Sequence, residues 1–283
     1  MKINKIETNI TFFILLFSNF LINFHSLSVL SIITGSIIAF LLIMLTNNLN
    51  LTKYKLTKII IFLISISILP IFLNKITYFI SSNILRNYSG IVISFLILLT
   101  SFILIKKGYH TIIKVVLLSS YFYIFILILG IFLSSFYLKI ENYDLSIIND
   151  NNLFINSLYY GICIFYIYLI CYLKNAKFNI KTFIYSNLFN LGYYLFIIGI
   201  LGNTLLNIYE YPYIVIYKKI NLLNFIERIE FIFSINYLFC LFYLFIFIHF
   251  SIKNNLNIKK NKYKSLILIV ITILIFITSI LIN

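Results

Sequence analysis

The segment Tyr211–Phe239, YPYIVIYKKINLLNFIERIEFIFSINYLF, is the part of the chain where charge and apolar character meet most closely. Arg228 lies between Glu227 and Glu230 at the start of an apolar run, and Glu210 immediately precedes the segment. Charged side chains at the entrance of a membrane helix are costly, so by default they indicate a functional site. The alternative is that these residues are solvated and cap the helix, and the sequence leaves both interpretations open.

The spacing of these charges limits which of them can interact. Helix residues three or four positions apart share a face. One stripe of the predicted helix is therefore made of Glu227, Glu230, Ser234 and Tyr237. Arg228 lies about 100° from Glu227 around the helix and has no acidic residue three or four positions away. If Arg228 is shielded from water, we expect its partner to come from another segment.

The composition of the whole chain is that of a membrane protein. Apolar residues make up 62% of the 283 residues and charged residues only 10%, and the mean hydropathy is +1.06. Soluble domains have roughly 45 to 50% apolar and 25% charged residues. Ile, Asn, Lys, Phe and Tyr are abundant and Trp is absent, as an AT-rich genome would produce, so we give single Asn and Lys residues less weight.

The apolar runs predict an all-α polytopic bundle that forms one integral membrane domain over residues 1–283. A membrane-spanning helix needs about 20 predominantly apolar residues. Nine segments have approximately that length: 8–25, 28–46, 58–80, 89–105, 113–137, 153–173, 182–202, 226–250 and 265–282.

The basic residues predict the orientation of these spans. Positive charge gathers in the cytoplasmic loops of membrane proteins. Sixteen of the 22 basic residues fall on one side if the spans alternate: Lys2, Lys5, Lys53, Lys55, Lys58, Lys106, Lys107, Lys114, Lys174, Lys177, Lys181, Lys253, Lys259, Lys260, Lys262 and Lys264. Six of the seven acids fall on the opposite side. The N-terminus is therefore predicted to be cytoplasmic, and the net charge of +15 is a topology signal that does not call for a nucleic-acid partner.

The long connection 203–225 contains its own apolar run, Tyr213–Tyr217, which predicts a short helix on the outer face that can act as a lid. Cys163, Cys171 and Cys240 lie inside apolar runs without a CxxC pair, so we expect buried thiols and neither a disulfide nor a metal site. No span carries a nucleophile with a base at a spacing that catalysis needs. We therefore expect neither an enzyme nor a cofactor.

Three groups of residues resemble one family. Pro212, Lys218–Ile220 and Asn224–Glu230 follow one another in an order that resembles the B subunits of bacterial spore germinant receptors, the spore germination permeases. In that family a proline-led segment precedes a Phe-x-x-Arg-hydrophobic-acid helix start. Lys106–Ile112 resembles the family's basic turn with a glycine, and Asp144–Ser146 resembles its short acidic segment outside the membrane. The resemblance runs from about residue 28 to 283.

This resemblance implies the fold of the amino acid/polyamine/organocation transporters, in which two five-helix repeats have inverted orientations. It places a ligand pocket between the first, third, sixth and eighth helices. The chain has nine predicted spans and no glycine before Gly35, whereas family members have about ten helices and a glycine-rich break in the first. We therefore expect a transporter-like fold that lacks a tenth helix, and ligand binding that is altered or lost.

Four residues are candidates for the pocket that the resemblance implies. Asn19, Asn23, Tyr160 and Gly161 are polar or unwindable positions at similar depth in two helices that correspond under an inverted repeat. A glycine in a membrane helix also serves as a packing contact, and this alternative stays open for Gly161. A second set of candidates forms a structural or coupling motif: Pro212, Glu227, Arg228 and Glu230.

The resemblance implies a membrane subunit that senses an amino acid or a similar small nutrient and passes the signal to other germinant receptor subunits. Its location would be the spore inner membrane or the cell membrane of a spore-forming bacterium, in contact with lipid. Two alternatives are a secondary amino acid transporter of the same fold and a degenerate scaffold subunit that binds nothing. Proton-coupled transport usually needs an ionisable residue deep in a span, and the acids here lie at span ends.

Overall fold

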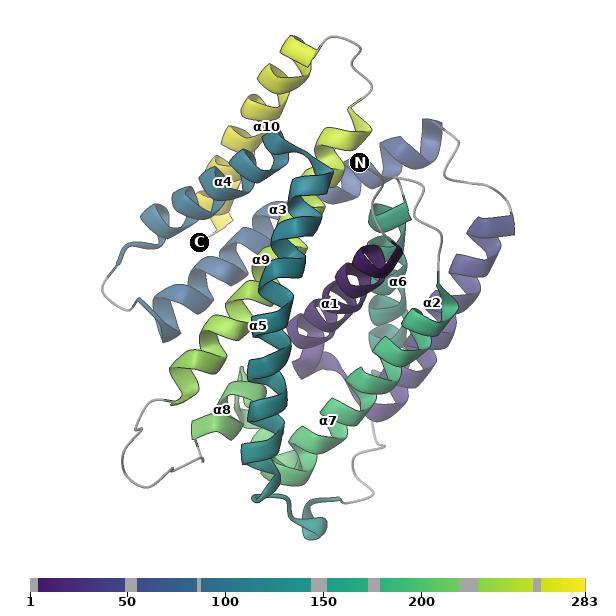
Figure 1. Cartoon of the computed structure of the whole chain (residues 1–283), viewed down its shortest axis with the longest axis vertical. Helices are drawn as coiled ribbons and strands as arrows, with labels where there is room; N and C mark the ends of the chain where they lie inside the picture. The colour runs from purple at the N-terminus through teal and green to yellow at the C-terminus, as the bar shows by residue number, and fades with distance from the viewer. Residues whose placement is uncertain are drawn as a thin grey trace.

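The computed structural model of the chain describes residues 5–48, 55–85, 88–143, 152–172, 179–218, 229–256 and 261–282. These ranges are helical apart from short turns, and none of them contains a strand. The predicted fold class, an all-α polytopic helical bundle, is confirmed (Figure 1).

The bundle is made of long helices joined by short connections. In chain order the elements are α1 (Lys5–Asn23), η1 (Phe24–Ser26), α2 (Val29–Asn48), α3 (Lys55–Asn83), α4 (Gly90–Lys107), α5 (Tyr109–Ser135), η3 (Ile140–Asn142), α6 (Leu153–Tyr172), α7 (Ile180–Ile208), α8 (Pro212–Lys218), α9 (Ile229–Asn255) and α10 (Asn261–Ile282).

Eight of the described helices, α1 to α7 and α9, are long and apolar enough to cross a membrane. They correspond to the first eight predicted spans. The ninth predicted span is α10, whose apolar part, Ser265–Leu281, is slightly shorter than the others. The helix α8 is far too short to span and corresponds to the short helix predicted from the run Tyr213–Tyr217.

The helices α1 and α9 form the centre of the bundle. In α1 and α9, 61% and 67% of the apolar window is buried, compared with 33% in α2, α3, α4 and α5. The helix α1 packs against α5, α6, α7 and α9, and α9 packs against α3 and α4 as well. In Figure 1, α1 lies in the middle of the bundle, between α5 and α6. A residue in α1 or α9 is therefore surrounded by protein, whereas the outer helices expose large apolar side chains, as lipid contact requires.

The packing of the first four helices is repeated by a second set of four. In this comparison α1, α2, α3 and α4 correspond to α6, α7, α9 and α10, in that order. The contact between α2 and α6 then corresponds to the contact between α7 and α1, and both are present. The contact between α3 and α10 likewise corresponds to that between α9 and α4. The pairs α1–α6, α2–α7, α3–α9 and α4–α10, which map onto themselves, are also in contact. Consecutive spans alternate in direction, so corresponding helices cross the membrane in opposite senses. This is the packing expected of two inverted halves.

The helix α5 breaks this correspondence. It packs against α1, α9 and α4, and in the described part of the chain no helix occupies the equivalent place beside α6, α3 and α10. The second half is therefore one helix shorter than the first in the packing that the structure describes.

Two glycines adopt backbone conformations with positive φ that other residues rarely take. Gly108, with φ of 105°, joins the end of α4 directly to the start of α5. Gly202, with φ of 76°, interrupts α7 near its end. At the tight turn around Gly108, the Nζ atom of Lys253 donates to the carbonyl oxygen of Ile105 at 2.5 Å, and this places a positive charge at the C-terminus of α4.

Candidate functional site

The short helix α8 is inserted into one end of the bundle, where it contacts α7, α9 and α5. Pro212 begins it, which fits the rule that a proline is tolerated in the first turn of a helix because the missing N–H has no partner there. Five of its residues are buried: Pro212, Tyr213, Ile214, Ile216 and Tyr217. Figure 1 shows α8 at the lower end of the bundle, beside the first turns of α9.

Aromatic rings attach α8 to its neighbours. The Tyr217 ring stacks on the Phe233 ring of α9, with centroids 3.6 Å apart. Gly130 of α5 leaves room for this pair, because a Cβ there would lie 2.7 Å from Cε1 of Tyr217. The Tyr213 ring lies 4.6 Å from the Tyr237 ring. The helix α8 therefore covers the ends of α5 and α9 with a layer of rings.

A group of buried polar side chains lies beneath α8. This polar core consists of Tyr123 of α5, Tyr160 of α6, Asn190 and Tyr193 of α7, Tyr217 of α8 and Asn236 of α9. The Phe17 ring of α1 packs against two of them, 5.4 Å from the ring of Tyr193 and 6.1 Å from that of Tyr123.

Hydrogen bonds join the members of the polar core in pairs. The Tyr193 and Tyr217 hydroxyls are 3.0 Å apart and connect α7 to the lid helix α8. The Asn190 amide nitrogen donates to the Tyr160 hydroxyl at 3.2 Å. The Asn236 amide nitrogen donates to the carbonyl oxygen of Tyr123 at 3.4 Å.

Other polar atoms of this group are buried without a partner. They are the Tyr123 hydroxyl, Asn190 Oδ1 and Asn236 Oδ1. The Tyr123 hydroxyl does lie beside the Cys240 thiol, but without a well-formed hydrogen bond. Leaving a buried polar group unpaired costs about 1–3 kcal/mol. The polar core therefore offers both donors and acceptors to a bound molecule.

The polar core is uncharged. Among the described residues, the buried side chains with polar atoms are Ser, Thr, Asn, Tyr, Cys and one His, and no carboxylate, Lys or Arg is buried. The described residues also hold no cluster of three or more His, Cys, Asp or Glu that could bind a metal. Burial raises the pKa of Tyr217 to about 12, so this hydroxyl is neutral at physiological pH. The chemistry available is hydrogen bonding and aromatic contact.

Three of the four predicted pocket residues have buried side chains, and two of them bond to each other. Asn23 Nδ2 donates to Oδ1 of Asn19 at 3.1 Å and to its carbonyl oxygen at 3.0 Å. Tyr160 is fully buried and bonds to Asn190 of α7. Tyr160 therefore belongs to the polar core, whereas Asn19 and Asn23 bond to each other within α1.

Gly161 lies in a close helix contact, which is the alternative to a pocket position that the sequence left open. A Cβ at this position would lie 2.8 Å from the carbonyl oxygen of Gly35 and 3.2 Å from Ile38, both on α2. The reciprocal contact holds too, since a Cβ on Gly35 would lie 3.3 Å from the Gly161 nitrogen. The helix α6 continues through this position. Gly161 therefore lets α2 and α6 approach closely, which is the packing role that small residues have in membrane bundles.

The second predicted set is described only in part. Glu227 and Arg228 lie outside the described residues. Glu230 is half-buried in the first turn of α9, and its carbonyl oxygen accepts a hydrogen bond from Ser234. Pro212 begins the buried lid helix α8.

The sequence did not identify Asn190, Tyr193, Tyr217 and Asn236 as site residues. Each is a polar residue in or beside an apolar run, which is a signal that the sequence does contain. In a chain this rich in Asn and Tyr, a single polar residue of either type is weak evidence for a site.

A second group of polar side chains lies near the C-terminal part of α9. The Ser65 hydroxyl is 2.6 Å from that of Tyr166 and 2.5 Å from that of Ser251, which ties α3, α6 and α9 together. Two positions before Ser251, Nδ1 of the fully buried His249 is 3.1 Å from the Ser101 hydroxyl, and its Nε2 has no partner. These bonds fasten α9 to its neighbours.

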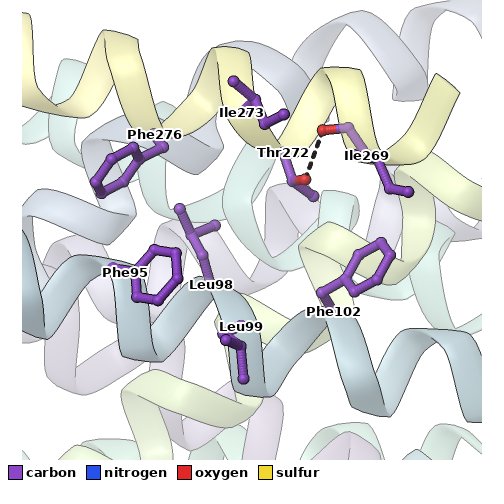
Figure 2. Close-up of a pocket in the computed structure, with 8 residues that line it drawn as sticks. All are labelled: Phe95, Leu98, Leu99, Phe102, Ile269, Thr272, Ile273 and Phe276. Atoms are coloured by element: carbon purple, nitrogen blue, oxygen red, sulfur yellow. Dashed lines mark hydrogen bonds between the residues drawn. The ribbon is translucent and has the colours of Figure 1, made fainter. Parts of the chain in front are cut away.

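A groove of about 200 Å³ lies away from both polar groups, between α4 and α10. Figure 2 shows the side chains of the two helices facing each other across it. The only hydroxyl, that of Thr272, donates to the carbonyl oxygen of Ile269 in its own helix. The groove is lined by Phe95, Leu98, Leu99, Phe102, Ile269, Thr272, Ile273 and Phe276. It offers apolar surface only.

The chain matches no protein-family model, no curated protein and no solved structure.

Proposed function

We propose that the chain is a nutrient-sensing membrane subunit of the spore germinant receptor type, which binds a small polar molecule, such as an amino acid, in the polar core beneath α8. The support comes from the order of residues between Pro212 and Glu230, which resembles the spore germination permeases, and from a bundle with two inverted halves. In this role it resides in the spore inner membrane or the cell membrane and acts with other receptor subunits.

One observation carries the proposal. Polar atoms of Tyr123, Asn190 and Asn236, which come from α5, α7 and α9, are buried in the polar core without partners. A soluble or membrane core normally satisfies such groups, so a set of unpaired ones is a cost that a bound molecule can offset. A ligand that donates to the two Asn oxygens and accepts from the Tyr123 hydroxyl would hold α5, α7 and α9 in one arrangement.

The helix α8 provides the way in. It is short and separate from the long helices, and its rings pack on α9, so in this proposal it moves to admit the ligand without breaking a spanning helix. Binding beneath it links the ligand to α9 through Tyr217 and Phe233. A change at the polar core is thereby passed to α9, the most buried helix, which contacts most of the bundle.

The test is the nutrient response of the organism that carries the gene. In a deletion strain complemented with Asn236→Leu, we expect loss of the nutrient-triggered response with an unchanged amount of protein in the membrane. Asn255→Leu is the matched control, because Asn255 is also a buried, unpartnered amide of α9 but lies at the far end of the helix. Equal responses of the two variants would reject the polar core as the ligand site.

His249 supports a second candidate function, proton-coupled transport. It is fully buried in α9, and ionisable residues inside a membrane bundle mark proton pathways by default. In proteoliposomes, a transporter accumulates substrate when a pH gradient is applied, and His249→Gln abolishes this. A sensor binds its ligand but shows no accumulation in the same assay.

A further inference from the structure

An exposed stripe of apolar residues with one lysine runs along α3. Ile64, Ile71 and Tyr78 are 37%, 51% and 55% exposed, Lys75 is also exposed, and Ile68 is partly buried. The positions 64, 68, 71, 75 and 78 alternate in steps of four and three. This is the spacing by which one helix presents a seam to another.

The stripe borders α6. Lys75 lies close enough to Cys163 of α6 to interact with its thiol electrostatically. Next to Cys163, α6 exposes Tyr159 and Ile162, which are 53% and 54% exposed. The exposed surface therefore includes one face of α3 and the neighbouring part of α6.

The repeated packing of the bundle shows which position in the other half corresponds to this exposed surface. In the first half, α5 fills the place beside α1, α9 and α4. The equivalent place in the second half is the surface beside α6, α3 and α10, and no helix of the described part of the chain occupies it. The seam on α3 faces the place where a helix equivalent to α5 would pack.

Lys75 indicates what such a helix would carry. It lies eight residues before α3 ends at Asn83, or about 12 Å along the helix axis. It forms no ion pair or hydrogen bond with the residues that the structure describes. A charge on the lipid-facing side of a membrane helix is costly, and membrane proteins reduce this cost by pairing it with an opposite charge.

We propose that the seam formed by Ile64, Ile71, Lys75 and Tyr78 is the docking site for one transmembrane helix of another protein, and that this helix carries an Asp or Glu that pairs with Lys75. A second copy of this chain does not fit, because its own acidic residues lie at the ends of the apolar runs or in the connections between them. The proposal rests on the subunit role proposed above, and it names the surface and the chemistry of the partner.

The experiment measures docking in the absence of any nutrient. Its result can therefore contradict the docking site without contradicting the ligand site, and the reverse. A photo-crosslinking amino acid replaces Ile71 in membranes of the natural host, and the adduct is identified by mass spectrometry. Phe125, which is 64% exposed on α5, is the matched control position on a lipid-facing surface. We expect Ile71 to yield a single protein adduct on a transmembrane segment that contains an Asp or Glu, and Phe125 to yield only lipid adducts.

The charge of Lys75 is then tested in the same assay. Lys75→Leu should reduce the adduct about tenfold, a change worth about 1.4 kcal/mol, and Lys75→Arg should retain it. Lys75→Glu should lose the adduct, and a lysine in place of the partner's acid should restore it. Lipid adducts alone at Ile71, a partner segment without an acid, or an adduct that is unchanged in Lys75→Leu would each overturn the proposal.

Discussion

The ring of Tyr217 in α8 lies parallel to the ring of Phe233 in α9, with an interplanar angle of 10°. Both rings occupy space that the absent side chain of Gly130 leaves open on α5. The hydroxyl of the same tyrosine meets that of Tyr193 on α7. Tyr217 of α8 therefore contacts three spanning helices. Changes at Gly130 and Tyr217 test whether α8 closes the site.

Gly130→Ala should weaken the packing of α8 against α5 and α9. The new methyl group would overlap the stacked rings, and overpacking a well-filled core costs about 1–3 kcal/mol. We expect a lower thermal midpoint of the detergent-solubilised protein and faster proteolysis near α8. Gly192→Ala is the control, because a Cβ at Gly192 meets no atom within 4 Å. If both variants have the same thermal midpoint as the wild type, the packing of α8 does not depend on a glycine at position 130.

Gly161→Ala should separate α2 from α6. Its Cβ would meet the backbone oxygen of Gly35, which cannot rotate away as a side chain does. We expect less folded protein in the membrane and a lower thermal midpoint, again compared with Gly192→Ala. A Gly161→Ala protein of normal stability that fails to bind ligand would instead support the pocket role expected from the sequence.

The stability of the protein should fall between pH 10 and 12. Burial raises the pKa of Tyr217 from 10 to about 12, so in this interval the unfolded chain has lost the proton that the folded protein keeps. A pKa shift of two units corresponds to about 2.7 kcal/mol of folding free energy. This stabilisation is fully present below pH 10 and is lost by about pH 12. Tyr217→Phe removes this contribution, so its thermal midpoint should fall less steeply over the interval. Parallel pH profiles for the two proteins would contradict the buried environment of this hydroxyl.

The orientation of the bundle can be measured with single cysteines. With the three native cysteines replaced, a cysteine at the exposed Glu141 should react with an impermeant reagent in intact cells, and one at the exposed Lys107 only after permeabilisation. The reason is the concentration of lysines on one side of the predicted spans. Labelling of the Lys107 position in intact cells and of the Glu141 position only after permeabilisation would contradict a cytoplasmic N-terminus.

The spans could be predicted from the sequence because length and apolar content alone decide what crosses a bilayer. The lid helix could be predicted for a similar reason, since the run Tyr213–Tyr217 is too short to span and lies between two longer runs. The start of α9 around Arg228 lies outside the described residues, and its role stays a prediction.

The contacts between helices could not be predicted from single residues. Gly161 showed that a close approach was present, but a glycine does not indicate which neighbour it faces, and the structure places Gly35 of α2 against it. The fit of Gly130 to Tyr217 and Phe233 joins three distant segments and has no periodic signal. Asn190 and Asn236 are polar positions inside apolar runs, but in a chain rich in Asn this signal is shared by many residues.

The central claim is that the polar core beneath α8 binds a small polar nutrient, and ligand-induced stabilisation of the purified protein tests it most directly. The measurement is the thermal midpoint of wild type and Asn190→Leu with a panel of amino acids, sugars and nucleosides. A ligand at 100 times its Kd stabilises the folded state by about 2.7 kcal/mol. We predict that at least one compound raises the midpoint of the wild type and leaves that of Asn190→Leu unchanged. A panel without effect on the wild type, or an equal rise in both proteins, would contradict the account.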